Sequence, residues 1–326
     1  MTIPNPLTLT LALTLAIAAA SCSATSTPGG QRAAKTTPAK TAPEFEADSA
    51  LSYACMQCGF GPRVPGTPVH SQCGQWLAAR LSSLCPSVTV QEASLTATGG
   101  SPIEARNIIA QFNPDSALRI LLIAHWDSRP WADHDPDPSR HNEPVMGAND
   151  GASGVAVLLE LARLMANEAP PIGVDILLTD AEDSGQNDDE GSWALGTQYW
   201  AANPHKHPYR PVFGILLDMV GAPGACFARE YYSMRYAQSV VTTVWTTAHA
   251  AGYGDYFPNV LGGAITDDHV FINRAGIKCI DIIDQRQDSD TGFFEQWHTT
   301  SDTPDRLDPA TLKAVGQTLT NLIYLY

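Results

Sequence analysis

Two kinds of hydrophobic pattern alternate along the chain from about residue 47 onward. Short, unbroken apolar runs are typical of buried strands. They occupy residues 118–124, 174–179, 213–217 and 277–283. Longer segments, in which apolar residues recur at every third or fourth position, are typical of helices. These are residues 73–84, 151–165, 233–251 and 309–325. The alternation predicts an α/β fold in which helices cover a sheet.

No internal repeat and no second linker interrupts this part of the chain, so we expect a single domain at residues 47–326. The whole chain has 326 residues, of which 44% are hydrophobic, and this composition excludes a disordered chain, a collagen and a coiled coil. Acidic residues outnumber basic ones by 34 to 19, for a net charge of −15. Because phosphate backbones repel such a surface, we expect no nucleic-acid partner.

The beginning of the chain is typical of an exported protein. Residues 7–20 form an uncharged run that is too short to span a membrane, which fits the apolar part of a signal peptide. Small residues precede Cys22, as at a bacterial lipoprotein cleavage site. We therefore expect residues 1–22 to form a lipoprotein-like signal segment that is cleaved just before Cys22, and Cys22 to carry a lipid anchor. Ordinary cleavage nearby is the alternative. Residues 23–46, rich in Ser, Thr, Pro and Ala, predict a disordered tether. The protein is then expected in the periplasm or cell envelope.

Six cysteines remain beside Cys22, and export permits disulfides. Four of them, Cys55, Cys58, Cys73 and Cys85, fall within 31 residues, so bridges that pin this segment are compatible with the sequence, without a defined pairing. A zinc site at Cys55 and Cys58 is disfavoured because no second cysteine pair matches it. Cys279 lies in an apolar strand pattern and is expected to be a buried thiol.

Chemically reactive side chains directly follow the predicted strands, where open α/β sheets bind their ligands. These groups are His125-Trp126-Asp127, Asp180-Ala181-Glu182-Asp183 and Asp218, with further groups at Gly147-Ala148-Asn149-Asp150-Gly151, Asp267-Asp268-His269 and Trp297-His298. Helix or turn capping accounts for one or two of them, such as Asp150 or Asp180, but not for all these loops. Because buried carboxylates without partners are costly, the pattern predicts a metal site or a catalytic network.

Histidine nitrogen and carboxylate oxygen are ligands that suit Zn²⁺. A catalytic zinc takes three protein ligands and leaves one position open, and a neighbouring carboxylate that is not a ligand can act as the general base. The adjacent Glu182 and Asp183 offer both roles from one loop, because neighbouring side chains can point in different directions.

At these residues the chain resembles the zinc aminopeptidase and glutaminyl cyclase superfamily, and within it the bacterial zinc-dependent glutaminyl-peptide cyclotransferases of the lipoprotein type. The segments that carry the resemblance are FGPRVPGTPVH (60–70), AHWDSRP (124–130), GANDGASG (147–154), DAEDSG (180–185), ILLDMVGAP (215–223), TDDHVFINRAGI (266–277) and QWHTTSDT (296–303). It implies one catalytic domain with a mixed, mostly parallel central sheet flanked by helices, as in zinc exopeptidases.

The resemblance also implies a cofactor and a reaction. Asp150, Asp183 and His298 would bind one zinc ion per chain, and Glu182 would shuttle a proton. The implied enzyme is an acyltransferase that closes the amino-terminal Gln of peptides or proteins to pyroglutamate and releases ammonia. We expect it to be a monomer that meets the membrane only through a lipid anchor.

Four other residues receive roles from the resemblance. Asp218 and Asp267 would form an acidic hydrogen-bond network beside the scissile group. Trp297 would line the substrate pocket, and Trp193 would add an aromatic surface.

Two departures from the relatives stand out. Asp183 occupies the ligand position at which many relatives have Glu, so the zinc or the loop must shift by about one methylene. Ala124 stands before His125 where animal cyclases have a cysteine, so their local disulfide cannot form.

A two-zinc aminopeptidase is the main alternative. In that enzyme class a second zinc is held by residues that match His125, Asp150 and Asp218, and all three are present. Asp267, where such peptidases commonly have a small residue, and Trp297 favour the cyclase. A non-catalytic surface lipoprotein is a third hypothesis, which the intact set of ligands and base disfavours.

Several other polar residues are expected to have no role in the chemistry. Asp133, Asp135 and Asp137 are spaced like the start of a calcium loop, but Pro138 replaces the required glycine, so a solvated loop is expected. For His269 we expect a structural hydrogen bond.

Overall fold

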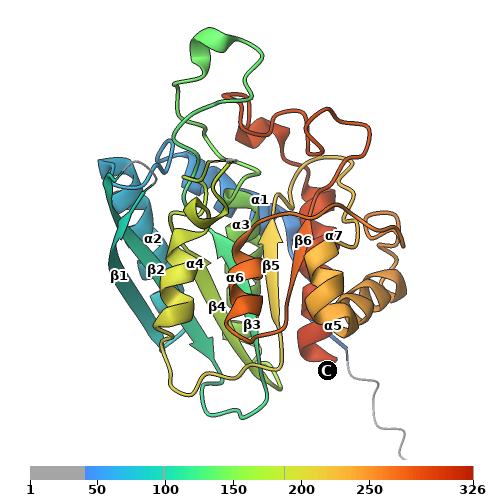
Figure 1. The fold of residues 1–326 in the computed structure, drawn as a ribbon. Coiled ribbons are helices and arrows are strands. Elements are labelled where there is room, and N and C mark those ends of the chain that lie inside the picture. The colour runs from blue at the N-terminus through green and yellow to red at the C-terminus, as the bar shows by residue number, and fades with distance from the viewer. Residues whose placement is uncertain (1–40, 98–99, 187, 326) are drawn as a thin grey trace, which may run out of the picture. The chain divides into compact units, whose positions relative to one another are not determined.

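The computed structural model describes residues 41–97, 100–186 and 188–325, and they form a layered α/β domain. Its centre is a six-stranded mixed sheet in the order β1-β2-β4-β3-β5-β6 (Figure 1). The strands are β1 (Val88–Thr96), β2 (Pro102–Phe112), β3 (Arg119–His125), β4 (Gly173–Thr179), β5 (Gly214–Asp218) and β6 (Cys279–Ile283). Strands β3 to β6 are mutually parallel, whereas β2 is antiparallel to both of its neighbours.

Seven α-helices are found in the described residues. They are α1 (Ala47–Cys58), α2 (Pro68–Leu84), α3 (Ala152–Asn167), α4 (Leu195–Ala202), α5 (Tyr231–Ala250), α6 (Asp268–Arg274) and α7 (Pro309–Tyr324). Three 3-10 turns, η1 (Pro138–Arg140), η2 (Glu190–Ser192) and η3 (Pro304–Arg306), lie in the loops. The ends of the helices follow local signals, since Thr67 caps α2 and Asp308 caps α7 through their side chains.

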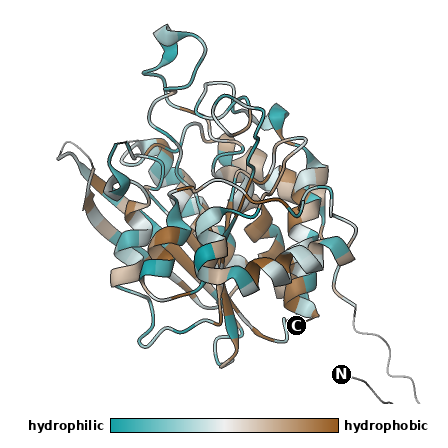
Figure 2. Ribbon diagram, turned by 45° about the vertical axis from the view of Figure 1, so that its right-hand side comes forward, coloured by the Kyte–Doolittle hydropathy of each residue, from teal (hydrophilic) through white to brown (hydrophobic). Residues whose placement is uncertain are grey.

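The two faces of the sheet bury different helices because side chains alternate along each strand. Ile120, Leu122 and Ala124 of β3 belong to the larger core, to which α1, α2, α3, α5 and α7 contribute. Leu121 and Ile123 point to the other face, where they cluster with Trp200 of α4 and Ile272 of α6. Strands covered on both faces explain the unbroken apolar runs, and hydrophobic residues are concentrated on the strands at the centre of the ribbon (Figure 2).

The predicted fold class is confirmed, with one domain built on a mixed, mostly parallel sheet. The four predicted strands correspond to β3, β4, β5 and β6, and the four predicted helices correspond to α2, α3, α5 and α7. The antiparallel pair β1–β2 and the helices α1, α4 and α6 were not predicted.

The domain begins slightly before the predicted boundary at residue 47. Phe45 is completely buried, its ring lies against Gly316 of α7, and its backbone N–H donates to Gln317 Oε1 at 2.8 Å. The expectation of a tether up to residue 46 is therefore wrong for residues 41–46, because one aromatic side chain anchors them. The signal peptide, Cys22 and residues 23–40 lie outside the described residues. No helix of the described part is long and apolar enough to cross a membrane.

The six cysteines of the described part of the chain are unpaired. Cys58, Cys73 and Cys85 are buried and Cys55 is exposed, all as free thiols, so the bridges that the sequence permits among them are not formed. Cys73 and Cys85 belong to the larger hydrophobic core, and the Cys85 thiol donates to the carbonyl of Gln111. Cys279 is buried as predicted, and burial raises the pKa of its thiol well above the ordinary value.

Candidate metal centre and active site

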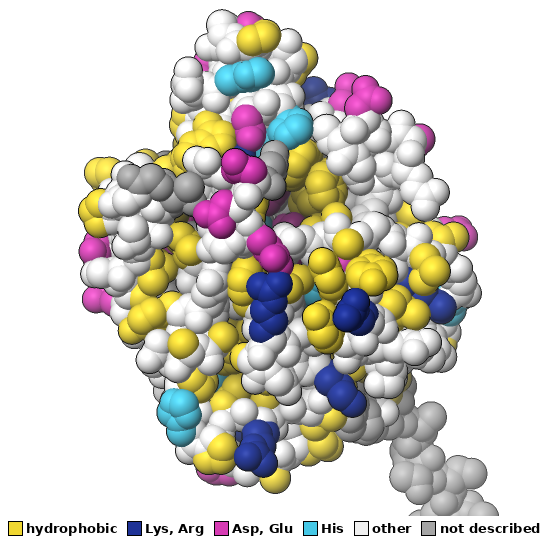
Figure 3. Space-filling view, viewed as in Figure 1, with side chains coloured by type: hydrophobic (Ala, Val, Ile, Leu, Met, Phe, Trp, Pro, Cys, Tyr) yellow, Lys and Arg dark blue, Asp and Glu magenta, His cyan; other side chains and the backbone are white. Residues whose placement is uncertain are grey.

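The predicted site residues meet above the carboxyl ends of the parallel strands. His125 ends β3, Asp218 ends β5, and Glu182 and Asp183 follow β4 in the same direction. Loops before α3 and α6 add Asp150 and Asp267, and the loop before η3 adds Trp297 and His298. Seven of these eight side chains, all except His125, line a cavity of about 280 Å³, in the part of the surface where acidic, histidine and hydrophobic side chains gather (Figure 3).

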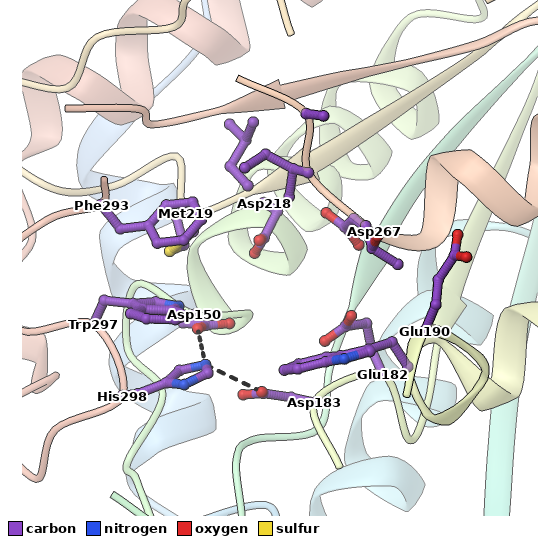
Figure 4. A pocket seen from close by; sticks show the side chains of 15 residues that line it. Asp150, Glu182, Asp183, Glu190, Asp218, Met219, Asp267, Phe293, Trp297 and His298 are labelled. Carbon is purple, nitrogen blue, oxygen red and sulfur yellow. Dashed lines mark ion pairs between the residues drawn. The ribbon is translucent and has the colours of Figure 1, made fainter. Parts of the chain in front are cut away.

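Asp150, Asp183 and His298 form the first group of candidate ligands. One donor atom from each lies within 4.8 Å of the others, and all three residues are buried. His298 Nε2 lies 3.3 Å from Asp183 Oδ1 and 3.7 Å from Asp150 Oδ2, and both carboxylates point toward it (Figure 4). The second oxygen of Asp183 is buried without a hydrogen-bond partner in the structure. Two carboxylates, one imidazole and an unpaired oxygen fit a catalytic zinc site.

A second group shares Asp150 with the first. His125 Nε2 lies 3.1 Å from Asp150 Oδ1 and 3.2 Å from Asp218 Oδ1, and one donor atom from each of these three residues lies within 4.8 Å of the others. Bridging by one aspartate is the arrangement that the two-zinc alternative requires. The distances alone therefore do not separate one bound ion from two.

Arg129 and Asp133 support the first group from behind. Asp133 Oδ1 lies 3.3 Å from His298 Nδ1, and Arg129 donates to both oxygens of Asp133 at 2.7–2.8 Å. Arg129 also donates to Asp183 Oδ1 at 3.2 Å. One guanidinium therefore contacts both the candidate ligand Asp183 and Asp133, the partner of the candidate ligand His298. These contacts fix the orientation of the imidazole. The expectation of a solvated loop is wrong for Asp133, which supports His298, and for Asp135, which is buried and accepts a hydrogen bond from the Thr300 hydroxyl. Of these three aspartates, only Asp137 is exposed.

Asp127 holds the loop that carries Glu182 and Asp183. Its two oxygens accept the backbone N–H groups of Glu182 at 3.1 Å and of Asp183 at 3.2 Å. Asp127 is completely buried, so these bonds are shielded from water. Its place directly after a predicted strand was the available sequence signal, but sequence reasoning gave it no role.

The buried acids on the other side of the cavity have shifted pKa values. Burial, followed by the charge of Asp267, raises the pKa of Glu182 well above its ordinary value. Burial and the charge of Asp218 do the same for Asp267. Burial and the charge of Asp150 raise the pKa of Asp218 to about 6. A carboxyl group with a raised pKa is suited to exchange protons near neutrality.

Behind these acids lies a second buried layer that the sequence did not indicate. Asp281 of β6 has its pKa raised well above the ordinary value by burial and by the charge of Asp267. His269 Nε2 hydrogen-bonds to Glu230 Oε2 at 3.1 Å, which confirms the expected structural role of this histidine.

Aromatic side chains form the opposite wall. Trp297 stacks on the His298 ring with centroids 3.7 Å apart, and Phe293 contacts Trp297 at 4.6 Å. The ring centroid of Trp193 lies 6.5 Å from that of His298, with the two rings nearly parallel, and the Arg129 guanidinium lies over the Trp193 ring. Figure 4 shows Trp297 and Phe293 facing the acids across the cavity. A small polar group bound between the walls would contact an aromatic face and several carboxylates at once.

Glu190 completes the cavity at its mouth. Its side chain is 48% exposed, lines the cavity and pairs with Arg274 of α6. Glu190, like Phe293 on the aromatic wall, is a pocket residue that the sequence did not indicate.

Known proteins resemble the chain over most of its length. Residues 107–323 match the model of Peptidase family M28. The crystal structure of Bacteroides thetaiotaomicron glutaminyl cyclase bound to N-acetylhistamine is 49% identical, with a TM-score of 0.86 over 88% of this chain and 100% of the other. A leucine aminopeptidase precursor from the same species is also 49% identical, with a TM-score of 0.85 over 88% and 99%. The glutaminyl-peptide cyclotransferase-like protein of Bos taurus is 26% identical over 79% of this chain and 70% of its own length.

Proposed function

The chain belongs to peptidase family M28, and within that family we propose that it is a zinc-dependent glutaminyl-peptide cyclotransferase. Its substrates are peptides or proteins with an amino-terminal Gln, and its products are pyroglutamyl peptides and ammonia. The observation that carries the proposal is the convergence of Asp150, Asp183 and His298 on one point, in a cavity that also holds Glu182 and Asp267. The similarity to glutaminyl cyclases supports it.

Asp150, Asp183 and His298 are the proposed ligands of one zinc ion. When bound, zinc supplies Lewis-acid polarisation of a carbonyl oxygen, which is worth several kcal/mol in transition-state stabilisation. The Arg129–Asp133 pair keeps His298 in place for this task, and Asp127 keeps the Asp183 backbone in place.

Glu182 is the proposed proton shuttle. The neutral form of the substrate α-amine, whose conjugate acid has a pKa of about 7.7–8.0 in solution, attacks the carbonyl carbon of the side-chain amide, and Glu182 accepts one proton from the attacking nitrogen. A bond forms between the α-nitrogen and this carbon, the bond from the carbon to the amide nitrogen breaks, and Glu182 returns the proton to the departing ammonia. The raised pKa of Glu182, caused by burial and by Asp267, suits both transfers.

The other pocket residues bind and orient the substrate. Asp218 and Asp267 are placed to hydrogen-bond the α-amine and the leaving nitrogen, and Trp297 is placed to pack on the folded Gln side chain, with Trp193 beside it. Because the attack is intramolecular, alignment by these contacts can supply up to about 7–11 kcal/mol of the lowered barrier.

A two-zinc aminopeptidase is the second candidate, favoured by the group His125, Asp150 and Asp218 and by the similarity to the leucine aminopeptidase precursor. The buried Asp267 beside Asp218 disfavours it, because an additional carboxylate suits hydrogen bonding between acids.

One experiment separates the two candidates. The zinc-loaded protein is incubated with Gln-peptides and, separately, with Leu-peptides, and ammonia and free amino acids are both measured. Ammonia from Gln-peptides without release of Leu is the expected result. Free Leu, with two zinc ions per chain, would establish the aminopeptidase. If neither ammonia nor free Leu is formed, the protein is a non-catalytic binding protein.

We also propose that the protein is exported and tethered to the cell envelope through a lipid on Cys22, and that it acts as a monomer. Labelling of the cells with a radioactive fatty acid should mark the wild-type protein and not the Cys22→Ala variant.

A further inference from the structure

A buried carboxylate outside the cavity holds the loop that presents Asp150. Asp302 accepts the backbone N–H of Asn149 at 2.8 Å and that of Asp150 at 3.1 Å. The side chain of Asp302 is completely buried and does not line the cavity. Its hydrogen bonds therefore act on the backbone of a proposed ligand and not on substrate.

Arg63 holds the same loop by its carbonyl groups. Its guanidinium donates to the carbonyl oxygens of Met146 at 2.8 Å and Gly147 at 2.7 Å, and its third bond goes to the carbonyl of Trp126 at 2.8 Å. Arg63 is also completely buried. At Gly147 the backbone has φ +67°, and a Cβ atom there would lie 2.3 Å from the Asp150 carbonyl oxygen and 3.0 Å from the guanidinium. The close fit thus requires glycine.

Asp302 also connects two proposed zinc ligands. It lies four residues after His298, in a turn closed by the bond from Asp302 N–H to the Thr299 carbonyl at 3.3 Å. The backbone N–H of Ala148 returns the contact by donating to the Asp302 carbonyl at 3.3 Å. The segment of His298 and the segment of Asp150 are consequently joined by three hydrogen bonds at one residue.

We propose that Asp302 and Arg63 are positioning residues that set the zinc affinity of the site by fixing Asp150 relative to His298. This inference rests on the proposed function, which places zinc on Asp150, Asp183 and His298. Both residues suit the task because they are completely buried, so that their hydrogen bonds are shielded from water. Loss of an outer partner of this kind typically weakens metal affinity by about 10–100-fold.

The test is the zinc dissociation constant of Asp302→Asn, measured by competition with a chromogenic chelator. An asparagine has the same shape but offers one acceptor oxygen, and its NH₂ group faces the second backbone N–H. We expect zinc affinity to fall about 10–100-fold. With zinc in excess, kcat for a Gln-peptide should fall while KM changes by less than about threefold. If Asp302→Asn does not fold, Arg63→Lys carries the test, because lysine keeps the charge but lacks the planar set of donors.

Two controls separate positioning from general stability. Asp308→Ala removes the N-cap of α7, so it should lower the melting temperature without changing zinc affinity. Asp305→Asn alters an exposed side chain in the same segment and should change neither. Wild-type zinc affinity in Asp302→Asn, or an equal loss of affinity in Asp308→Ala, would overturn the inference. A wild-type protein that binds no zinc would instead overturn the proposed function.

Discussion

Two groups of potential zinc ligands share Asp150 but differ in their surroundings. In the group of His298, the second oxygen of Asp183 is buried without a partner and the imidazole faces the aromatic cavity. In the group of His125, one imidazole nitrogen lies within 3.2 Å of both Asp150 and Asp218, and the other imidazole nitrogen is buried without a hydrogen-bond partner. The first group therefore leaves a carboxylate oxygen free to bind a cation, whereas both carboxylates of the second group contact the imidazole. Ligand identity alone, which is similar in both groups, does not reveal this difference.

The largest effect should come from removing the histidine of each group in turn. His298→Ala should lose zinc and fall to background activity, because it removes one of the proposed zinc ligands. Loss of a residue that only hydrogen-bonds to a ligand typically weakens metal affinity by about 10–100-fold, and loss of the ligand should weaken it more. His125→Ala should keep one zinc per chain and measurable cyclisation. Zinc content by elemental analysis and ammonia release measure the two effects. Equal loss of zinc and activity in both variants would mean that the groups work as one two-metal site.

The next effect separates chemistry from metal binding. Glu182→Gln should reduce kcat about 10²–10⁴-fold, because the amide cannot carry the proton, while the zinc content remains that of the wild type. Rates on a Gln-peptide and zinc content of the same preparation test this. A variant with near wild-type turnover would remove Glu182 as the shuttle, and a variant without zinc would make it a ligand.

The smallest effect is expected at the mouth of the cavity. Glu190→Gln breaks the pair with Arg274, but both side chains are about half exposed, and such pairs contribute little. We expect kcat/KM within about threefold of the wild type, which makes this variant a matched control for Glu182→Gln. A loss above about tenfold would show that Glu190 contacts the substrate.

Much of the fold was predictable because its signal is local. Strands such as β3, covered by helices on both faces, leave unbroken apolar runs, and the larger apolar side chains of α3 recur at helical spacing although the helix is buried on nearly all sides. The hairpin β1–β2 escaped prediction because β1 lies at the edge of the sheet and is largely exposed, so its pattern is polar. The short helices α4 and α6 have too few turns to show a period.

The site was predictable to a similar degree. Asp183 and Asp218 could be identified from the sequence, because they are acidic residues that closely follow apolar strand segments. The supporting residues Asp133 and Asp302 could not be assigned a role, because their partners lie far away in sequence and become visible only in three dimensions.

The number of zinc ions needed for turnover tests the central claim most directly. Protein stripped with a chelator is titrated with zinc while ammonia release from a Gln-peptide is followed. If Asp150, Asp183 and His298 hold the one ion that matters, activity should rise linearly and reach its plateau at one zinc per chain. Activity that appears only with the second equivalent, or that is unchanged by removing zinc, would contradict the account.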